Sequence, residues 1–144
     1  MSRLQNAIER LKTQQLSCIA LKGDDEYIST ERGLRPLMKP LRVDPDFFKD
    51  AIIIDRVIGK SAAFLLIRAR IQRLHTIMIS THAIKLLEKH NIPFTYEKEV
   101  PYIINDTQTG MCPMEETVLN IEDVEEAYLA LENKIKALMM QQNP

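Results

Sequence analysis

The chain has 144 residues, a length that fits one domain, with 19 basic and 20 acidic side chains and a formal net charge of −1. This balance argues against a nucleic-acid binder that works mainly by neutralising phosphates, so we expect no nucleic-acid partner. The apolar stretches are too short to span a bilayer and the charged N-terminus has no signal-peptide segment, so we expect a cytoplasmic protein without a membrane partner.

The first third of the chain predicts a helix followed by a hairpin. Apolar residues recur at helical spacing over residues 2–15, which indicates an amphipathic N-terminal helix. Residues 16–22 are typical of a strand, and residues 26–30 are typical of the strand that returns after a turn. Residues 33–45 contain three prolines, so we expect an irregular segment there.

A long buried helix is predicted for the centre of the chain. It begins at about Asp46 or Asp50 and ends at Arg70, and it is apolar on nearly every side between Val57 and Ile67. A helix of this kind packs between a sheet and further helices.

The second half of the chain alternates between strands and helices. Residues 74–80 predict a buried strand, and a helix capped by Ser80 or Thr81 follows as far as His90. Residues 93–99 and 102–105 are short strand candidates. The loop 106–110 then leads to a helix that begins at Pro113.

The C-terminal helix, over about residues 120–140, has the most regular apolar period. Its stripe consists of Ile121, Val124, Tyr128, Leu131, Ile135 and Leu138. Such a stripe packs on a sheet or on another helix, and an interface between subunits of a homo-oligomer is one of the options.

The most informative stretch surrounds Cys112. A helix that begins at Pro113 directs its free N–H groups and its positive dipole end toward the Cys112 sulfur, which would lower the thiol pKa. Glu115 stands where a capping-box side chain folds back, or it serves as a general acid or base. Gly110 would allow a ligand to approach the backbone. The alternative is a structural cysteine at the start of a capped helix.

Charged residues at the front of the central helix form a second candidate site. Asp55 and Lys60 stand in an apolar segment, so they must be paired, reach solvent or line a cleft. The structural alternative is that Lys60 extends to solvent and Asp55 belongs to a polar helix start. Two cysteines without a C-x-x-C pair and three scattered histidines predict no metal site, although His82 at a helix start is suited to face a cleft.

Three stretches resemble an uncharacterised prokaryotic family with a cytidine-deaminase-like fold. They are residues 55–63, 96–105 and 109–115, and they occur in the expected order. The resemblance implies an α/β domain over residues 1–144, with three α/β/α layers, a mixed central sheet and an extra C-terminal helix.

The resemblance also implies that the zinc chemistry of deaminases is absent. In zinc deaminases one metal-binding motif opens one helix and Pro-Cys-x-x-Cys opens the next. Here Gly59-Lys60-Ser61 replaces the first motif, and the stretch around Cys112 retains one cysteine of the second. The resemblance further implies that Asp55, Lys60 and Cys112 meet where two helix starts face each other.

Two main functional hypotheses follow. The first is a zinc-independent enzyme that acts on a small nucleotide-like ligand, with Cys112 as nucleophile or persulfide carrier, Lys60 stabilising charge and Asp55 as orienting group or base. The second is a non-catalytic ligand-binding or regulatory domain that has lost the metal site. Both take a small-molecule ligand, and neither the reaction nor a cofactor is specified by these residues. The expected ligand contacts are Gly59, Ser61, Asn105 and Gly110.

Overall fold

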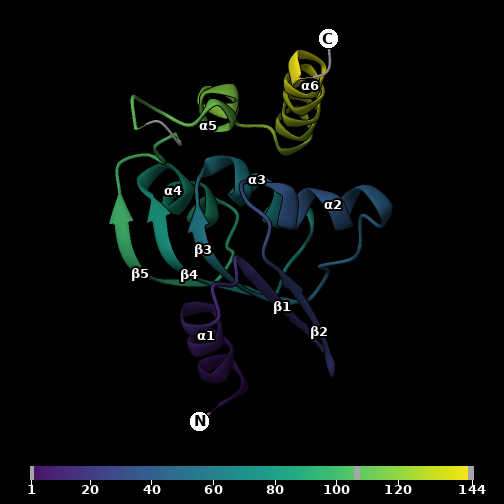
Figure 1. Cartoon of the computed structure of the whole chain (residues 1–144), viewed down its shortest axis with the longest axis vertical. Coiled ribbons are helices and arrows are strands. Elements are labelled where there is room, and N and C mark those ends of the chain that lie inside the picture. Colours follow the sequence, from purple (N-terminus) through teal and green to yellow (C-terminus); the bar gives the residue numbers. More distant parts are fainter. Residues whose placement is uncertain (1, 106–107, 143–144) are drawn as a thin grey trace.

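A mixed five-stranded sheet with helices on both faces forms the body of the molecule (Figure 1). The computed structural model describes residues 2–105 and 108–142. In chain order, the elements are α1 (Arg3–Thr13), β1 (Cys18–Lys22), β2 (Asp25–Ser29), α2 (Arg35–Val43), β3 (Ile52–Ile58), α3 (Lys60–Arg68), β4 (Arg73–Ser80), α4 (Thr81–Lys89), β5 (Phe94–Val100), α5 (Pro113–Val118) and α6 (Val124–Gln142).

The strands follow the order β2-β1-β3-β4-β5 across the sheet. β1 is antiparallel to both of its neighbours, whereas β3, β4 and β5 are parallel to one another. The helices α3 and α4 follow β3 and β4 in the chain and form the crossovers that parallel strands require. The prediction of an α/β protein with a mixed sheet is confirmed.

Alternate residues along the strands pack into two separate hydrophobic clusters. Ile19 and Ile54 belong to the cluster that contains the buried residues of α1. Cys18 and Ile53 belong to the cluster that contains the buried residues of α2, α3 and α4. Because successive side chains of a strand point to opposite faces, α1 covers one face of the sheet and these three helices cover the other.

Most predicted elements are present at the expected places. The N-terminal helix begins with a capping box, in which Ser2 and Gln5 bond reciprocally to each other's backbone. The hairpin, the strand β4, the helix from Pro113 and the C-terminal helix are also confirmed. Ser80 caps α4 by accepting a hydrogen bond from the backbone of Ala83, at 3.1 Å.

The predicted central helix over residues 46–70 is wrong. Residues 52–58 form the strand β3, Gly59 follows as N-cap, and only residues 60–68 are helical. The run Ile52-Ile53-Ile54 is β-branched and favours a strand. A strand that is buried on both faces is as continuously apolar as a buried helix, so the two cannot be separated by period alone.

The segment expected to be irregular contains the helix α2. Pro36 stands in its first turn, where a missing N–H costs nothing. Pro40 lies inside the helix and has no N–H to donate to the carbonyl of Pro36. The hydroxyl of Tyr27 donates to that carbonyl instead, at 2.9 Å. The strand β2 therefore supplies the hydrogen bond that the helix lacks.

The segment between β5 and α5 contains less strand than predicted. The first candidate corresponds to β5, but of residues 102–105 only Ile104 takes part in an isolated bridge, with Met111. Part of the predicted loop 106–110 lies outside the described residues, namely residues 106 and 107.

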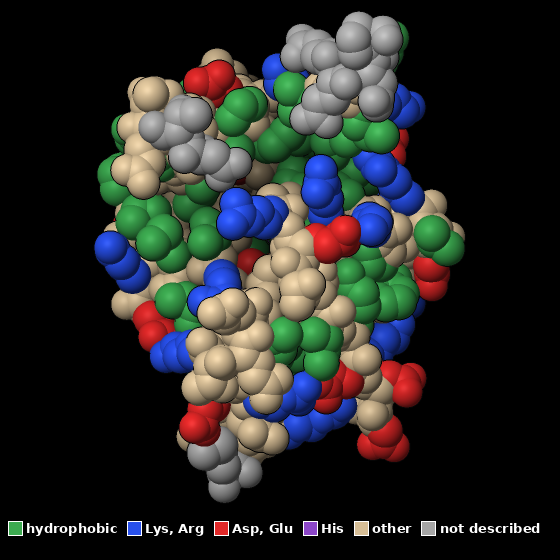
Figure 2. All heavy atoms as spheres, viewed as in Figure 1, with side chains coloured by type: hydrophobic (Ala, Val, Ile, Leu, Met, Phe, Trp, Pro, Cys, Tyr) green, Lys and Arg blue, Asp and Glu red, His purple; other side chains and the backbone are tan. Residues whose placement is uncertain are grey.

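The apolar stripe of α6 packs inside the same chain. Leu131 is fully buried, and Val124, Tyr128 and Ile135 pack against the core cluster that contains α3. Of the options for this stripe, packing on another helix of the same chain is therefore observed for these residues, and a homo-oligomer stays a prediction. In the part of the chain that the structure describes, no helix is long and apolar enough to cross a membrane. Figure 2 shows basic, acidic and hydrophobic side chains interspersed over the face in view.

Candidate functional site

The carboxylate of Glu115 caps the start of α3 from a distant part of the chain. One oxygen accepts from the backbone N–H of Lys60 at 2.6 Å, and the other accepts from the backbone N–H of Ser61 at 3.0 Å. The hydroxyl of Ser61 donates to the second oxygen as well. Glu115 is only 6% exposed. The free N–H groups of a helix start and its positive dipole end stabilise a negative charge, so this contact ties α5 to α3.

Gly59 makes this capping contact sterically possible. A Cβ atom at this position would lie 2.1 Å from Oε1 of Glu115, which no pair of non-bonded atoms tolerates. The backbone of Gly59 has an extended conformation that any residue can adopt. A glycine is therefore required here only because the carboxylate of Glu115 approaches its backbone so closely. The candidates Gly59, Lys60, Ser61 and Glu115 therefore lie together, but Glu115 does not fold back on its own helix as the capping-box pattern predicts.

The side chain of Lys60 leaves this cap and extends toward the connection between α5 and α6. Its Nζ donates to the carbonyl of Leu119 at 2.9 Å and lies 3.4 Å from Oε1 of Glu122. It also lies 5.7 Å from the centroid of the Phe64 ring. Lys60 is 6% exposed, so of the three predicted options, which are pairing, reaching solvent or lining a cleft, the structure shows a paired lysine rather than a solvent-exposed one.

Asp55 lies in the strand β3, and its helical placement is wrong. Its carboxyl group accepts from the backbone N–H of Val57 at 3.1 Å and hydrogen bonds with the thiol of Cys18 on the neighbouring strand β1. Burial raises its pKa to about 7, against the opposing effect of these hydrogen bonds. Asp55 is thus held within the sheet, whereas Lys60 is bound to the segment after α5, and these contacts do not bring the two together.

Cys112 is the N-cap of α5, as predicted, and is partly exposed. Its backbone N–H donates to the carbonyl of Ile103 at 2.9 Å, and its carbonyl accepts a hydrogen bond from the backbone N–H of Glu116 at 3.0 Å. Its side chain makes no capping hydrogen bond. The predicted meeting of Cys112 with Lys60 is not found among the contacts of the described residues, because Lys60 is directed to Leu119.

Asn105 and Gly110 shape the loop before Cys112. The backbone N–H of Asn105 donates to the carbonyl of Gly110 at 2.9 Å, and its side chain exchanges hydrogen bonds with Thr109. A Cβ atom on Gly110 would meet no atom of the described residues within 4 Å. Neither residue contacts the capped start of α3 through these bonds.

A pocket of about 230 Å³ lies beside Lys60 and carries an excess of positive charge. Its lining comes from the first residue of α3, from one face of α4 and from the α5–α6 connection: Lys60, His82, Lys85, Leu86, Lys89 and Glu122. We call it the basic pocket. Glu122 lies 3.6 Å from Lys89 as well as 3.4 Å from Lys60. The charge of Lys60 first, and that of Lys89 after it, lowers the pKa of Glu122.

Three charged lining residues are not among the candidates from the sequence, namely Lys85, Lys89 and Glu122. His82, Lys85 and Lys89 are separated by three and four positions, so they share one face of α4, and this spacing was the available signal. Only His82 was recognised as suited to face a cleft. Glu122 comes from a separate segment, and no pattern in the sequence links it to α4.

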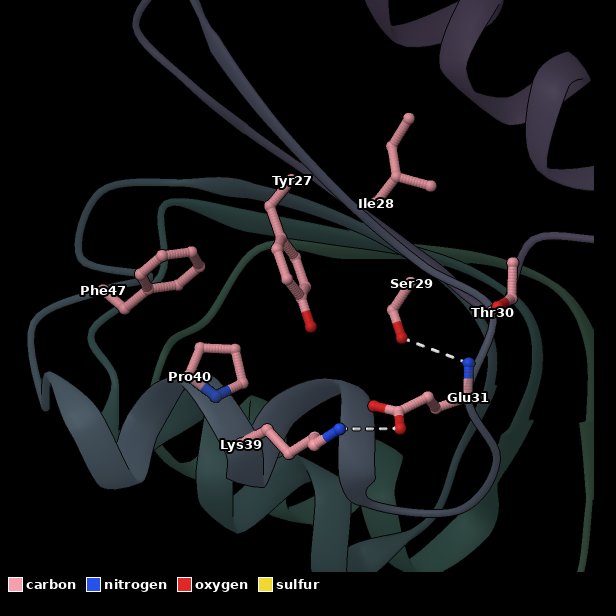
Figure 3. Close-up of a pocket in the computed structure, with 8 residues that line it drawn as sticks. All are labelled: Tyr27, Ile28, Ser29, Thr30, Glu31, Lys39, Pro40 and Phe47. Atoms are coloured by element: carbon pink, nitrogen blue, oxygen red, sulfur yellow. Dashed lines mark hydrogen bonds and ion pairs between the residues drawn. The ribbon is translucent and has the colours of Figure 1, made fainter.

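A larger and more open hollow of about 600 Å³ lies elsewhere, between β2 and α2 (Figure 3). Tyr27 and Phe47 form its apolar part, and Lys39 extends to Glu31 at its rim, at 2.8 Å. The Tyr27 hydroxyl is engaged with Pro36. The one lysine and the one glutamate of this lining pair with each other, so the hollow lacks the excess charge that the basic pocket offers a ligand.

Comparison with known proteins places the chain in a family. The family model TM1506, described as a domain of unknown function (DUF1893), matches residues 6–135. The chain belongs to the TM1506 family. A crystal structure of a DUF1893 family protein (TM1506) from Thermotoga maritima is 27% identical to it, with a TM-score of 0.84. The similarity covers 93% of this chain and 92% of that one. Curated proteins give no match.

The family is described as a domain of unknown function, so membership indicates no activity, and the residues of the site are the guide to function. Among the residues that the structure describes, no group of three or more His, Cys, Asp and Glu side chains is placed to hold a metal ion. The site therefore consists of the buried carboxylate of Glu115, which caps α3, and the basic pocket beside it.

Proposed function

We propose that this TM1506-family protein is a ligand-binding domain that takes a small anionic molecule in the basic pocket. The observation that carries the proposal is the charge of the lining: three lysines and a histidine surround the space, with Glu122 as the acidic residue. Like charges held close together repel, and an anion in the pocket relieves that repulsion. This corresponds to the second of the two hypotheses, a ligand-binding or regulatory domain.

The position of the pocket in the fold supports a binding role. Lys60 begins α3 directly after β3 and Gly59, and His82 is the second residue of α4, which begins where β4 ends. The pocket thus lies near the carboxyl ends of two parallel strands. In α/β sheets, ligands bind outside this edge, because the loops and helix starts converge there.

We also propose that the protein shares ancestry with the cytidine-deaminase-like fold. The mixed sheet with one antiparallel strand next to three parallel ones supports this relationship. The start of α3, which replaces the first zinc motif in that resemblance, is filled by the carboxylate of Glu115. A carboxylate that is already bound to two backbone N–H groups is poorly suited to shuttle protons, which favours binding over deamination.

The binding proposal is tested by calorimetric titration with inorganic phosphate at constant ionic strength. We expect the wild-type protein to bind phosphate and the double variant Lys85→Ala/Lys89→Ala to bind at least about tenfold more weakly, since each lost charge contact is worth about 1 kcal/mol. The matched control is Lys49→Ala/Lys98→Ala, which removes two exposed lysines of other segments. Equal weakening in both double variants would overturn the proposal, and so would a failure to bind phosphate both in the wild type and in a variant whose acidic lining residue Glu122 is replaced by Gln.

The cysteine-enzyme hypothesis stays a prediction. It is favoured by the partial exposure of Cys112 at the start of α5. It requires that iodoacetamide label Cys112 faster than a free cysteine in a short peptide. Labelling at or below the peptide rate would count against a nucleophile. A homo-oligomer likewise stays a prediction, and sedimentation velocity measures it.

A further inference from the structure

Glu122 bridges two lysines of the basic pocket through weak contacts. Its Oε1 lies 3.4 Å from Lys60 and its Oε2 lies 3.6 Å from Lys89, and its side chain is 64% exposed. Both distances exceed the 2.7–2.9 Å that is usual for a charge-assisted hydrogen bond. The pair with Lys89 is exposed on both sides, and such ion pairs contribute little to stability. In the pair with Lys60 the lysine is buried, but the carboxylate is exposed to water. The contact is therefore one that a better anion can replace.

One carboxylate does not neutralise the positive charges that line the basic pocket. Lys60, Lys85 and Lys89 supply three positive charges and Glu122 neutralises one of them, so two remain. Among the described residues Lys85 has no ion-pair partner, and the two oxygens of Glu122 are shared between Lys60 and Lys89. A phosphate monoester carries close to two negative charges at neutral pH and presents three terminal oxygens. It matches both the charge and the number of lysines.

Building on the proposed function, we infer that the ligand is a phosphate monoester and that its phosphoryl group binds by displacing Glu122. Glu122 is thus an internal competitor for the site. Lys60 stays in place when Glu122 leaves, because the carbonyl of Leu119 holds its Nζ and Glu115 caps its backbone. At about 230 Å³ the pocket accepts a phosphoryl group, and the rest of the ligand extends outward.

This arrangement gives binding a structural consequence. Glu122 lies in the connection between α5 and α6, next to Asp123, which caps α6 through the backbone N–H of Glu126 at 2.8 Å. Displacement of Glu122 frees the end of this connection next to α6 from Lys60 and Lys89. The carbonyl of Leu119, at the other end, stays bound to Lys60, and Glu115 continues to hold α5 on α3.

The test compares two charge-removing variants in calorimetric titrations with inorganic phosphate and with acetate, at constant ionic strength. Glu122→Gln should bind phosphate roughly two- to fivefold more tightly than the wild type, the range expected from the loss of exposed ion pairs. The control Glu125→Gln removes the same charge three residues further on. Its side chain is 69% exposed and pairs with Arg68, which does not line the pocket. This variant should bind as the wild type does, and acetate should bind more weakly than phosphate to all three proteins.

Each other outcome is informative. Equal tightening in both variants, or weaker binding by Glu122→Gln, overturns the competition while leaving the proposed function intact. Acetate that binds as tightly as phosphate overturns the phosphate class. Phosphate binding by Glu122→Gln alone supports the competition, and binding by neither the wild type nor Glu122→Gln overturns the proposed function together with the inference.

Discussion

Gly59 and Glu115 fit each other sterically across 56 positions of sequence. The carboxylate of Glu115 lies where a side chain of residue 59 would begin, with Oε1 only 2.1 Å from the place of a Cβ atom. The glycine thus lets a carboxylate from α5 reach the first turn of α3. The same turn positions Lys60 for the basic pocket, so this pair of residues connects the stability of the fold with the geometry of the site.

Gly59→Ala should destabilise the protein by about 1–3 kcal/mol, the usual cost of forcing extra atoms into a well-packed place. The added methyl group meets the carboxyl group of Glu115, which must leave the N–H groups that it binds. Urea denaturation gives the difference in unfolding free energy. Gly110→Ala is the control, because its new Cβ atom would have no neighbour within 4 Å among the residues that the structure describes. This variant should change stability by less than about 0.5 kcal/mol.

Glu115→Ala should cost about 2–3 kcal/mol, because it leaves two backbone N–H groups and one hydroxyl in a buried place without their acceptor. Glu115→Gln should cost less, since its amide keeps one acceptor oxygen. A double-mutant cycle with Ser61→Ala should give a coupling free energy of at least about 0.5 kcal/mol, as is usual for residues in direct contact. Strictly additive effects would show that the carboxylate does not bind the hydroxyl of Ser61 in solution.

The sequence predicted the elements that have a distinctive period or a clear boundary. The N-terminal helix, the hairpin, α4 and α6 all combine regular apolar spacing with a cap or a turn. The strand β3 was missed because a strand buried on both faces lacks the alternation that identifies strands. α2 was missed because the partner that makes Pro40 tolerable inside a helix is Tyr27, on another element.

The candidate site was predicted as a set of residues but without its geometry. Gly59, Lys60, Ser61 and Glu115 do lie together, yet the sequence pattern indicated a local capping box or an acid–base role for Glu115. Only the resemblance implied that two helix starts face each other, and it placed Cys112 rather than Glu115 beside Lys60. Contacts between distant segments depend on how helices pack. A local pattern holds no information on that packing.

Asp55→Asn should change how stability depends on pH. The folded-state pKa of Asp55 is raised to about 7 from its ordinary value near 3.8, mainly by burial. The folded protein therefore holds this proton more tightly than the unfolded chain does. Its contribution to stability is complete below about pH 3.8 and is lost as the pH rises through about 7.

The difference between these pKa values corresponds to about 4 kcal/mol. Relative to the wild type, Asp55→Asn should gain stability by up to that amount between acidic and mildly alkaline pH, as measured by urea denaturation across the pH range. The exposed Asp24→Asn, in the turn between β1 and β2, is the control and should follow the wild-type profile. Parallel profiles for wild type and Asp55→Asn would show that the carboxyl group titrates normally.

The two cysteines should differ sharply in their reaction with iodoacetamide. Cys18 is fully buried, and its thiol forms a hydrogen bond with the carboxyl group of Asp55. Burial, and after it the charge of Asp55, raises the pKa of this thiol well above its ordinary value. A buried thiol reacts only when the structure opens, and an opening that costs 5 kcal/mol or more slows labelling by at least about 1,000-fold. Cys112 is partly exposed and should react in the folded protein. Mass spectrometry of digested samples gives both rates, and Cys112→Ser should leave only the slow reaction. Comparable rates at the two positions would mean that β1 opens far more readily than its burial implies.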